Sequence, residues 1–263
     1  MKKVRLDVLI SEQMLGVSRE RAKAIIMSGS VFIAGQRADK PGMQVVPEAK
    51  IEIRSLSDYV SRGGQKLEKA LEHFALSPEG KVCIDIGAST GGFTDCLLKY
   101  GASLVYAIDV GYGQLAWKIR SDPRVITMER TNIRYVSADM FEKAPQFAVI
   151  DVSFISLALV LPVVKRLVLD DGKIICLIKP QFEAGRDKVG KKGVVREQST
   201  HIEVLETFIK NATESAFFVN GMTHSPVRGP EGNIEYLAWL DSHNRGACID
   251  VDATVVQAHE VLA

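Results

Sequence analysis

The strongest constraint in the sequence is a short apolar run that leads directly into a glycine-rich turn. Residues 82–86 are mostly apolar and few enough for a buried parallel strand, and Gly87, Gly91 and Gly92 follow at once. Apolar side chains then recur at helical spacing, at Phe93, Cys96, Leu97 and Tyr100. A strand, turn and helix of this kind bring backbone N–H groups close to a ligand at the carboxyl end of the strand. The stretch therefore predicts a cradle for a cofactor.

Two acids and the spacing of the glycines indicate which cofactor the cradle holds. A dinucleotide fold would place its glycines as G-x-G-x-x-G, whereas this turn has them at 87, 91 and 92, which argues against a nicotinamide cofactor. Asp85 can face the ammonium of an amino-acid moiety, and Asp109, which ends the next predicted strand, can accept hydrogen bonds from ribose hydroxyls. Glycine-rich turns also occur in α/β proteins without a cofactor. The agreement between the turn and both acids favours S-adenosylmethionine over that plainer interpretation.

Strands alternate with helices through most of the chain that follows. Strands are predicted at 104–109, 125–128, 147–151 and 173–179, and helices at 114–120, near Pro162 and at 197–211. This alternation predicts an α/β fold with a doubly wound parallel sheet. Two further strands, at 216–219 and 234–240, flank a turn-rich segment and predict a terminal antiparallel hairpin. Such a hairpin on a parallel sheet is typical of class I, or Rossmann-like, methyltransferases.

Charged residues stand at the ends of four predicted strands. Asp85, Asp109, Asp151 and Lys179 all lie at carboxyl ends, where open α/β sheets bind their ligands, and we interpret them as one site. A glycine-punctuated loop, 180–193, follows on the same edge and carries the basic residues Arg186, Lys188, Lys191 and Lys192. We interpret this loop as a lid or as a contact with RNA phosphates, with a solvated loop as the alternative.

The first 60 residues carry the excess of positive charge. They hold ten Lys and Arg against seven Asp and Glu, although the whole chain has a net charge of only +1. Ser18 is placed to cap a short helix over 19–26, and short strands are predicted at 31–33, 45–46 and 51–53. The helix is crowded with Arg19, Arg21 and Lys23. From charge alone, a helix that binds RNA phosphates and a merely solvated helix are equally good interpretations.

A second helix is predicted upstream of the cradle, over residues 66–74. Its apolar residues Leu67, Ala70, Leu71 and Phe74 form one stripe. The spacing does not distinguish Lys66 from Lys69 as a functional residue, and an exposed lysine is the plainer interpretation of either.

The cysteines, the N-terminus and the longest apolar run indicate the compartment in which the protein works. The four cysteines, Cys83, Cys96, Cys176 and Cys248, form no C-x-x-C pair and are interpreted as thiols in a reducing compartment, with no metal expected. The N-terminus lacks the apolar core of a signal peptide, and the apolar run between Asp151 and Lys165 is too short to span a membrane. We therefore expect a cytoplasmic protein with no membrane partner.

In combination, the motifs of the chain resemble those of the TlyA family. The matching segments are Ser61 to Leu67, Asp85 to Asp95, Asp151 to Leu157, Lys179 to Glu183 and Gly232 to Tyr236, together with an N-terminus similar to S4-type RNA-binding domains. The resemblance implies an α+β S4-type domain at 1–54, a linker at 55–61, an FtsJ-like methyltransferase domain at 62–243 and a tail at 244–263, for which we predict no structure. It also implies S-adenosylmethionine-dependent 2′-O-methylation of a cytidine ribose in ribosomal RNA, with ribosomal RNA or ribosomal subunits as partners.

The resemblance assigns roles to individual residues. FtsJ-like enzymes use a Lys-Asp-Lys-Glu tetrad, which corresponds here to Lys66, Asp151, Lys179 and Glu235. The implied cofactor contacts are Asp85, Gly87, Ala88, Ser89, Gly91, Gly92, Phe93, Thr94, Asp109, Val110, Asn132 and Asp151. Asn132 stands where relatives often have an acid, although an amide oxygen accepts the same hydrogen bond. The expected RNA-binding residues are Arg5, Arg19, Arg21, Lys23, Arg62, Arg186, Lys188, Lys191 and Lys192.

Two other classes of function remain open at this point. Some members of the family carry a haemolysin label, but a membrane-active protein needs an inserting segment, which the sequence does not show. A non-catalytic RNA-binding factor for ribosome assembly would keep the fold without turnover, and the four matching tetrad positions argue against it.

We expect the chain to bind S-adenosylmethionine and its demethylated product, and not NAD. Replacing Asp109 with alanine should weaken binding of S-adenosylmethionine, because the ribose hydroxyls lose their acceptor. Titration calorimetry on the wild type and Asp109→Ala measures both effects. Tighter binding of NAD, or an unchanged affinity in the variant, would contradict the expectation.

Overall fold

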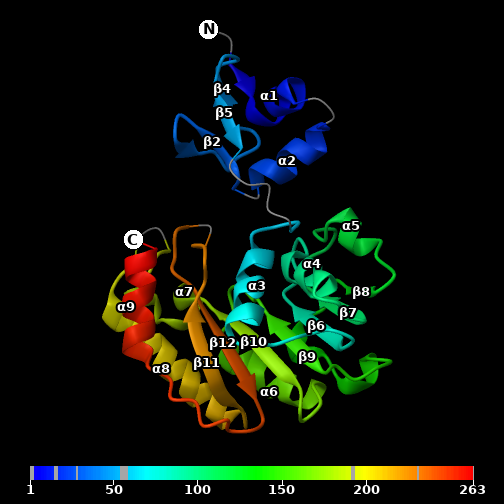
Figure 1. The fold of residues 1–263 in the computed structure, drawn as a ribbon, viewed down its shortest axis with the longest axis vertical. Helices are drawn as coiled ribbons and strands as arrows, with labels where there is room; N and C mark the ends of the chain where they lie inside the picture. Colours follow the sequence, from blue (N-terminus) through cyan, green and yellow to red (C-terminus); the bar gives the residue numbers. More distant parts are fainter. Residues whose placement is uncertain are drawn as a thin grey trace. The chain divides into compact units, whose positions relative to one another are not determined.

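The chain folds into two compact units, Met1–Arg62 and Gly63–Ala263, which are described separately (Figure 1). The computed structural model describes residues 3–14, 17–27, 29–53, 59–190, 193–229 and 231–262. Lys191 and Lys192, two of the expected RNA-binding residues, and most of the expected linker lie outside the described residues.

The N-terminal unit combines two short helices with short antiparallel strands. The helices are α1 (Leu6–Gln13) and α2 (Arg19–Met27), and the strands are β1 (Val4–Arg5), β2 (Val31–Ile33), β3 (Gln36–Arg37), β4 (Gln44–Val45) and β5 (Ile51–Ile53). The strands pair as β3-β2-β5 and β1-β4. The predicted cap of α2 is present, because Ser18 Oγ accepts a hydrogen bond from the backbone N–H of Arg21 at 3.2 Å. Leu6, Ile10, Ile26 and Val31 form the centre of the unit's own core.

The second unit is built on a seven-stranded sheet with the order β11-β12-β10-β9-β6-β7-β8. Its strands are β6 (Val82–Ile86), β7 (Leu104–Ile108), β8 (Val125–Met128), β9 (Phe147–Ile150), β10 (Lys173–Ile178), β11 (Phe218–His224) and β12 (Tyr236–Asp241). Strands β6 to β10 are parallel, whereas β12 runs antiparallel to β10 and to β11. The predicted parallel sheet with a terminal antiparallel hairpin is therefore confirmed.

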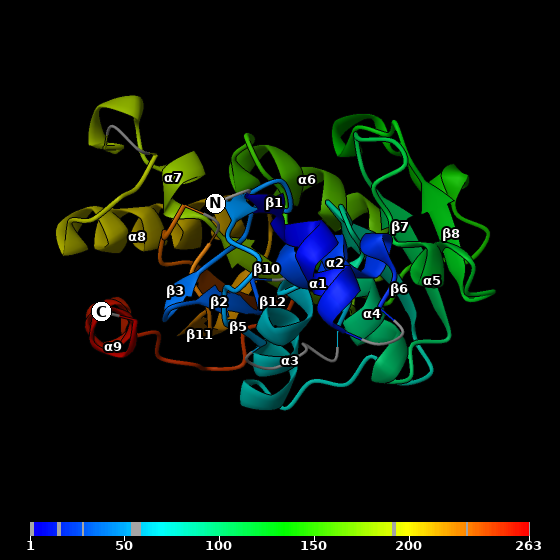
Figure 2. The same cartoon turned by 90° about the horizontal axis from the view of Figure 1, so that it is seen from above.

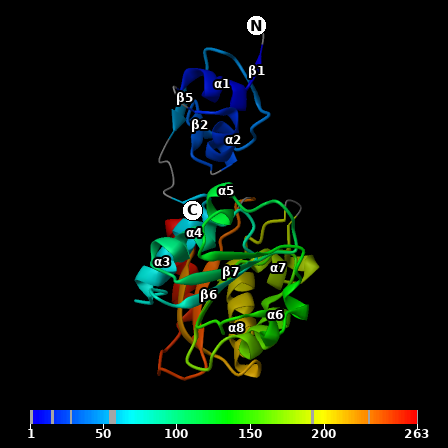
Figure 3. The same cartoon turned by 90° about the vertical axis from the view of Figure 1, so that its right-hand side faces the viewer.

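Helices cover both faces of this sheet (Figures 2 and 3). Helices α3 (Gly63–His73) and α4 (Gly92–Lys99) lie on one face, and α6 (Leu157–Leu167) and α8 (Gln198–Glu214) lie on the other. Shorter elements are α5 (Trp117–Arg120), α7 (Pro180–Glu183), η1 (Ile133–Tyr135), η2 (Ala138–Met140) and η3 (Arg186–Lys188). Val82, Ile84 and Ile86 of β6 share a buried cluster with residues of α6 and α8. Burial on both faces explains why the strands read as nearly continuous apolar runs.

The register of the central strands brings their carboxyl ends level. Ile86 of β6 is paired with Ile108 of β7 and with Ile150 of β9. The residues that follow, Gly87, Asp109 and Asp151, therefore emerge at one edge of the sheet. Strand order reverses at β6, since β7 and β8 continue on one side of it and β9 and β10 on the other, and ligands of open α/β sheets bind at such a point.

Two helices differ from the sequence-based prediction. The helix expected over 114–120 is reduced to α5, which begins only at Trp117. The apolar helix α6 begins at Leu157, where Ser156 Oγ accepts from the N–H of Ala158, and it continues through Pro162. Proline removes one helical hydrogen bond, but burial of the apolar residues around it compensates for that loss.

The C-terminal segment, for which no structure was predicted, contains a helix. Helix α9 (Val251–Val261) is capped by the Asp250 carboxylate, which accepts from the N–H of Ala253 at 2.9 Å. Val251, Val255 and Ala258 are buried at helical spacing and belong to the core cluster of the sheet. Helix α9 packs against α8 and the edge strand β11. Among the described residues, no helix is both long and apolar enough to cross a bilayer.

We expect Val255→Ala to lower the free energy of unfolding of the second unit by about 1–3 kcal/mol, because the side chain is fully buried and its removal leaves a cavity. Val256→Ala is the matched control. Val256 is 44% exposed, so the same change should cost no more than about 0.5 kcal/mol. Urea unfolding of both variants measures the difference, and equal effects would show that α9 is not part of the core.

Candidate active site

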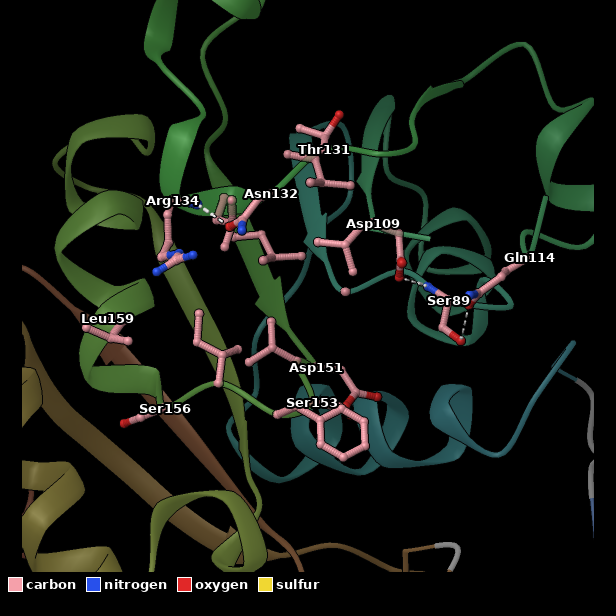
Figure 4. A pocket seen from close by; sticks show the side chains of 18 residues that line it. Ser89, Asp109, Gln114, Thr131, Asn132, Arg134, Asp151, Ser153, Ser156 and Leu159 are labelled. Atoms are coloured by element: carbon pink, nitrogen blue, oxygen red, sulfur yellow. Dashed lines mark hydrogen bonds between the residues drawn. The ribbon is translucent and has the colours of Figure 1, made fainter. Parts of the chain in front are cut away.

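A cavity of about 680 Å³ opens at the carboxyl edge of β6, β7 and β9. Six of the expected cofactor residues line it: Gly87, Ser89, Asp109, Val110, Asn132 and Asp151. Figure 4 shows Ser89, Asp109 and Gln114 together at one end, with Asp151 and Ser153 across the cavity from Thr131 and Asn132. The volume lies within the range of sites that hold small ligands.

The glycine turn owes its shape to backbone conformations that favour glycine. Gly87 has φ +88°, and a Cβ atom at this position would lie far inside contact distance of the Asp151 carbonyl oxygen. The backbones on either side are tied together, because Asp151 N–H donates to Ile86 O at 2.9 Å and Gly87 N–H donates to Ile108 O at 2.9 Å. Glycine at 87 therefore lets the turn after β6 pass directly over the end of β9.

The Asp109 carboxylate connects two loops at one end of the cavity. It accepts hydrogen bonds from Ser89 N–H at 2.8 Å and Gly111 N–H at 2.7 Å, one on each oxygen. Each carboxylate oxygen has a second lone pair, so the group can still accept from a ligand hydroxyl. This geometry suits the ribose contact expected from the sequence.

The other expected cofactor residues lie behind the lining of the cavity: Asp85, Ala88, Gly91, Gly92, Phe93 and Thr94. Asp85 is fully buried, and its Oδ2 accepts from Thr94 Oγ1 at 2.6 Å. Its Oδ1 has no hydrogen-bond partner in the described part of the chain. Burial raises the pKa of the Asp85 carboxyl to about 7. Asp85 thus joins β6 to α4 and is not among the residues that line the cavity, and its contact with a cofactor ammonium stays a prediction.

Asp151 connects the cavity to a buried lysine. Lys179 follows β10, and its Nζ lies 2.6 Å from Asp151 Oδ1 and donates a hydrogen bond to Ser153 Oγ at 3.0 Å. The ionic contact with Asp151 and the hydrogen bond to Ser153 together hold the ammonium in place. The Lys179 side chain is 12% exposed. A positive charge is thereby fixed beside the cavity with limited access to water.

The second lysine of the expected tetrad forms its own ion pair. Lys66, on α3, contacts Glu235, which immediately precedes β12, and the two side chains are only 9% and 1% exposed. The plainer expectation of an exposed lysine at 66 is therefore wrong. Lys69 lies one turn further along α3, where its Nζ is 3.2 Å from Nδ1 of the buried His224 and burial lowers its pKa. Of the two lysines that spacing left equivalent, Lys66 is the one paired with a tetrad acid.

Several lining residues were not expected from the sequence: Gln114, Thr131, Arg134, Ser153, Phe154 and Ser156. Asn132, which was expected, accepts from Arg134 N–H through Oδ1 at 3.1 Å and so caps η1. Phe154 is 90% exposed and has φ +63°, a conformation that is costly for a bulky residue. Its ring lies 4.9 Å from that of Phe182 on α7. Both belong to motifs named above, but their placement depends on loop geometry that spacing does not reveal.

Four of the basic residues expected to bind RNA have acidic neighbours. Arg5 and Arg19 both contact the buried Asp7, and Lys23 lies 2.7 Å from Glu20. Lys188 contacts Glu203. Arg21 and Arg186 are exposed, and Arg62 is half-buried.

Comparisons with known proteins agree with this architecture. A model of the FtsJ-like methyltransferase family matches residues 59–242, and a model of the S4 domain matches residues 4–51. The fold and the family match define the second unit as an FtsJ-like methyltransferase domain, preceded in the chain by an S4 domain.

Relatives share this arrangement over nearly the whole chain. A Bacillus subtilis protein provisionally named rRNA methyltransferase YqxC is 51% identical over 91% of this chain and 86% of its own. The 16S/23S rRNA (cytidine-2′-O)-methyltransferase TlyA of Mycobacterium tuberculosis is 42% identical over 91% and 90%. A solved Streptococcus thermophilus structure, described provisionally as a hemolysin, is 48% identical, has a TM-score of 0.79 and covers 99% of this chain and 97% of its own. The chain belongs to the TlyA family.

We expect Gly87→Ala to destabilise the second unit and to weaken cofactor binding. Gly87 has a positive φ, and the added Cβ would also clash with the Asp151 carbonyl. The loss in free energy of unfolding should therefore be about 1–3 kcal/mol larger than the loss caused by an alanine at a positive φ alone. Gly80→Ala is the control, because Gly80 has φ +69° with nothing within 4 Å of its Cβ position and should cost about 1–2 kcal/mol. Urea unfolding compares the two variants, and equal costs would contradict a close approach of Gly87 to Asp151.

Proposed function

We propose that this chain transfers a methyl group from S-adenosylmethionine to the ribose 2′-hydroxyl of a cytidine in ribosomal RNA. The observation that carries the proposal is the Lys179 ammonium, fixed by Asp151 and Ser153 at the border of the cavity. The names of the relatives support the choice of substrate, since the M. tuberculosis relative is named for cytidine 2′-O-methylation in 16S and 23S rRNA.

The side chains that line the cavity include hydrogen-bond acceptors that would suit S-adenosylmethionine. Asp109 would accept the ribose hydroxyls, and Asn132 would accept from the adenine amino group through its amide oxygen. The apolar side chains Ile108, Val110 and Ile133 line the same cavity and suit the faces of a purine ring. When bound, S-adenosylmethionine supplies an electrophilic methyl group on a sulfonium.

Lys179 would stabilise the oxygen that attacks the methyl group. A ribose hydroxyl loses its proton far above neutral pH, so the reaction needs a fixed positive charge where negative charge develops on the oxygen. Asp151 and Ser153 hold the ammonium in place before the substrate arrives, which avoids reorganisation during the reaction. Because its Nζ is held against the Asp151 carboxylate, we assign Lys179 to steering the oxygen and not to removing its proton.

The Lys66–Glu235 pair would complete the site from α3 and β12. Both side chains are buried, and removing either partner would leave an uncompensated charge in the interior. We assign Glu235 to orienting the lysines, and Lys66 to balancing the acids and holding the target nucleotide.

We assign RNA recognition to residues 1–54 and methyl transfer to residues 62–243. Residues 1–60 carry an excess of basic over acidic residues, and the S4 match at 4–51 lies within them. A ribosomal substrate would place the protein in the cytoplasm. Incubating the chain with labelled S-adenosylmethionine and ribosomal subunits, then mapping the modified nucleotide, tests the whole proposal. Absence of labelled 2′-O-methylcytidine in both subunits would contradict it.

We expect Lys179→Ala to lose on the order of 100- to 1,000-fold in single-turnover rate while keeping its affinity for S-adenosylmethionine, because the charge acts on the transition state and not on cofactor binding. Lys179→Arg should recover little, since a planar guanidinium cannot place a point charge at the same position. Rates and calorimetric affinities are measured on the same preparations.

The control for this experiment is Lys210→Ala, which removes a 76% exposed lysine from α8 and should leave both quantities unchanged. Near-normal turnover in Lys179→Ala, or a loss of cofactor binding in proportion to activity, would exclude Lys179 as the group that stabilises the oxygen.

A further inference from the structure

Among the described residues of the N-terminal unit, Asp7 is the one buried carboxylate, and it contacts two arginines. Arg5 donates from Nε to Asp7 Oδ1 and from Nη2 to Asp7 Oδ2, both at 2.9 Å, in a bidentate pair. Arg19 donates from Nε to Asp7 Oδ2 at 3.2 Å. Asp7 is fully buried, whereas Arg5 and Arg19 are 44% and 52% exposed. The hydrogen bonds from Arg5 are the largest cause of a pKa for Asp7 lowered to about 2, so the carboxylate is charged at neutral pH.

Three successive elements of the chain build this cluster. Arg5 ends β1, Asp7 lies in the first turn of α1, and Arg19 begins α2. Gly42 provides space on the far side, since a Cβ there would lie 3.3 Å from Arg5 Nη1. The positions of both guanidiniums are therefore set by the packing of α1 on α2 and by the turn at residue 42.

The guanidinium N–H groups that do not contact Asp7 are available to bind a phosphate. Nη1 of Arg5 and both Nη groups of Arg19 have no hydrogen-bond partner within the ranges that the structure describes. Guanidinium forks match the oxygens of a phosphate, and two forks held by one carboxylate lose little conformational entropy on binding. We propose that Asp7 is a positioning residue that makes Arg5 and Arg19 a single clamp for one RNA phosphate.

This inference rests on the proposed binding of RNA by residues 1–54. For the effect of neutralising Asp7 on RNA affinity, the clamp and simple charge attraction predict changes in opposite directions. Asp7 cancels part of the positive charge of the two arginines, so charge alone predicts that its neutralisation would strengthen binding to a polyanion. A clamp predicts the reverse, because the forks lose their common anchor.

The test measures the affinity of the full chain for total ribosomal RNA over a range of salt concentrations. Asp7→Asn should bind about tenfold more weakly, the loss expected for one misplaced charged contact, with a salt slope smaller by about one. Glu20→Gln is the matched control. It also removes one negative charge beside a basic residue, Lys23, but Glu20 is 83% exposed and anchors no fork, so RNA affinity should stay the same or rise.

A second variant keeps Asp7 and the fold intact. Arg19→Lys retains the charge but not the planar fork. The clamp therefore predicts about tenfold weaker RNA binding, whereas charge attraction alone predicts almost no loss of affinity. Arg37→Lys, in the same unit, is its control and should change affinity less than about twofold. Amide exchange of the N-terminal core shows whether Asp7→Asn remains folded, and if it does not, Arg19→Lys decides.

The outcomes separate the clamp from the proposed function. The clamp is supported if the wild type binds ribosomal RNA and both Arg19→Lys and a folded Asp7→Asn bind it more weakly. Equal or tighter binding in a folded Asp7→Asn, or wild-type affinity in Arg19→Lys, overturns the clamp and leaves the proposed function standing. If the wild type itself does not bind ribosomal RNA, the assignment of residues 1–54 to RNA fails, and the clamp fails with it.

Discussion

The contact of the Asp151 backbone with the glycine turn is the constraint on which the rest of the site depends. Gly87 passes over the Asp151 carbonyl, and the Asp151 N–H is bonded to Ile86 O, so the end of β9 is fixed against the end of β6. The side chain of the same residue lines the cavity and faces Lys179. One residue thus sets the distance between the cavity and the Lys179 ammonium, and a larger residue at 87 would disturb both.

Sequence patterns predicted the parts of the site that follow from strand ends. Asp109, Asp151 and Lys179 could be grouped because parallel strands deliver their carboxyl ends to one edge. The direction of Asp85 was harder to predict, since every residue of β6 is buried and either face offers an apolar environment. Lys66 and Glu235 lie far apart in sequence on α3 and beside β12, so only the resemblance to a family brought them together.

Long-range packing also explains what local patterns missed. The apolar residues of helix α9 recur at helical spacing, but they are buried only because the helix packs against α8 and β11. In the N-terminal unit, charge counting identified the basic helix but not the acid beneath it. Asp7 lies twelve residues before Arg19 in the sequence, and the contact between them becomes evident only when α1 packs on α2.

In the proposed reaction, the pairing of charges would constrain where the proton of the ribose hydroxyl goes. Methyl transfer to a hydroxyl releases one proton, and in the proposal Lys179 stabilises the oxygen and does not accept that proton. The buried Lys66–Glu235 pair has almost no contact with water, whereas Asp151 is 21% exposed and Lys179 is 12% exposed. A proton that leaves the hydroxyl late in the reaction can therefore pass to Asp151 or to water beside it. Under this proposal, stabilisation of the oxygen and removal of its proton would fall to different members of the same ion pair, which would give the lysine and the acid separate roles.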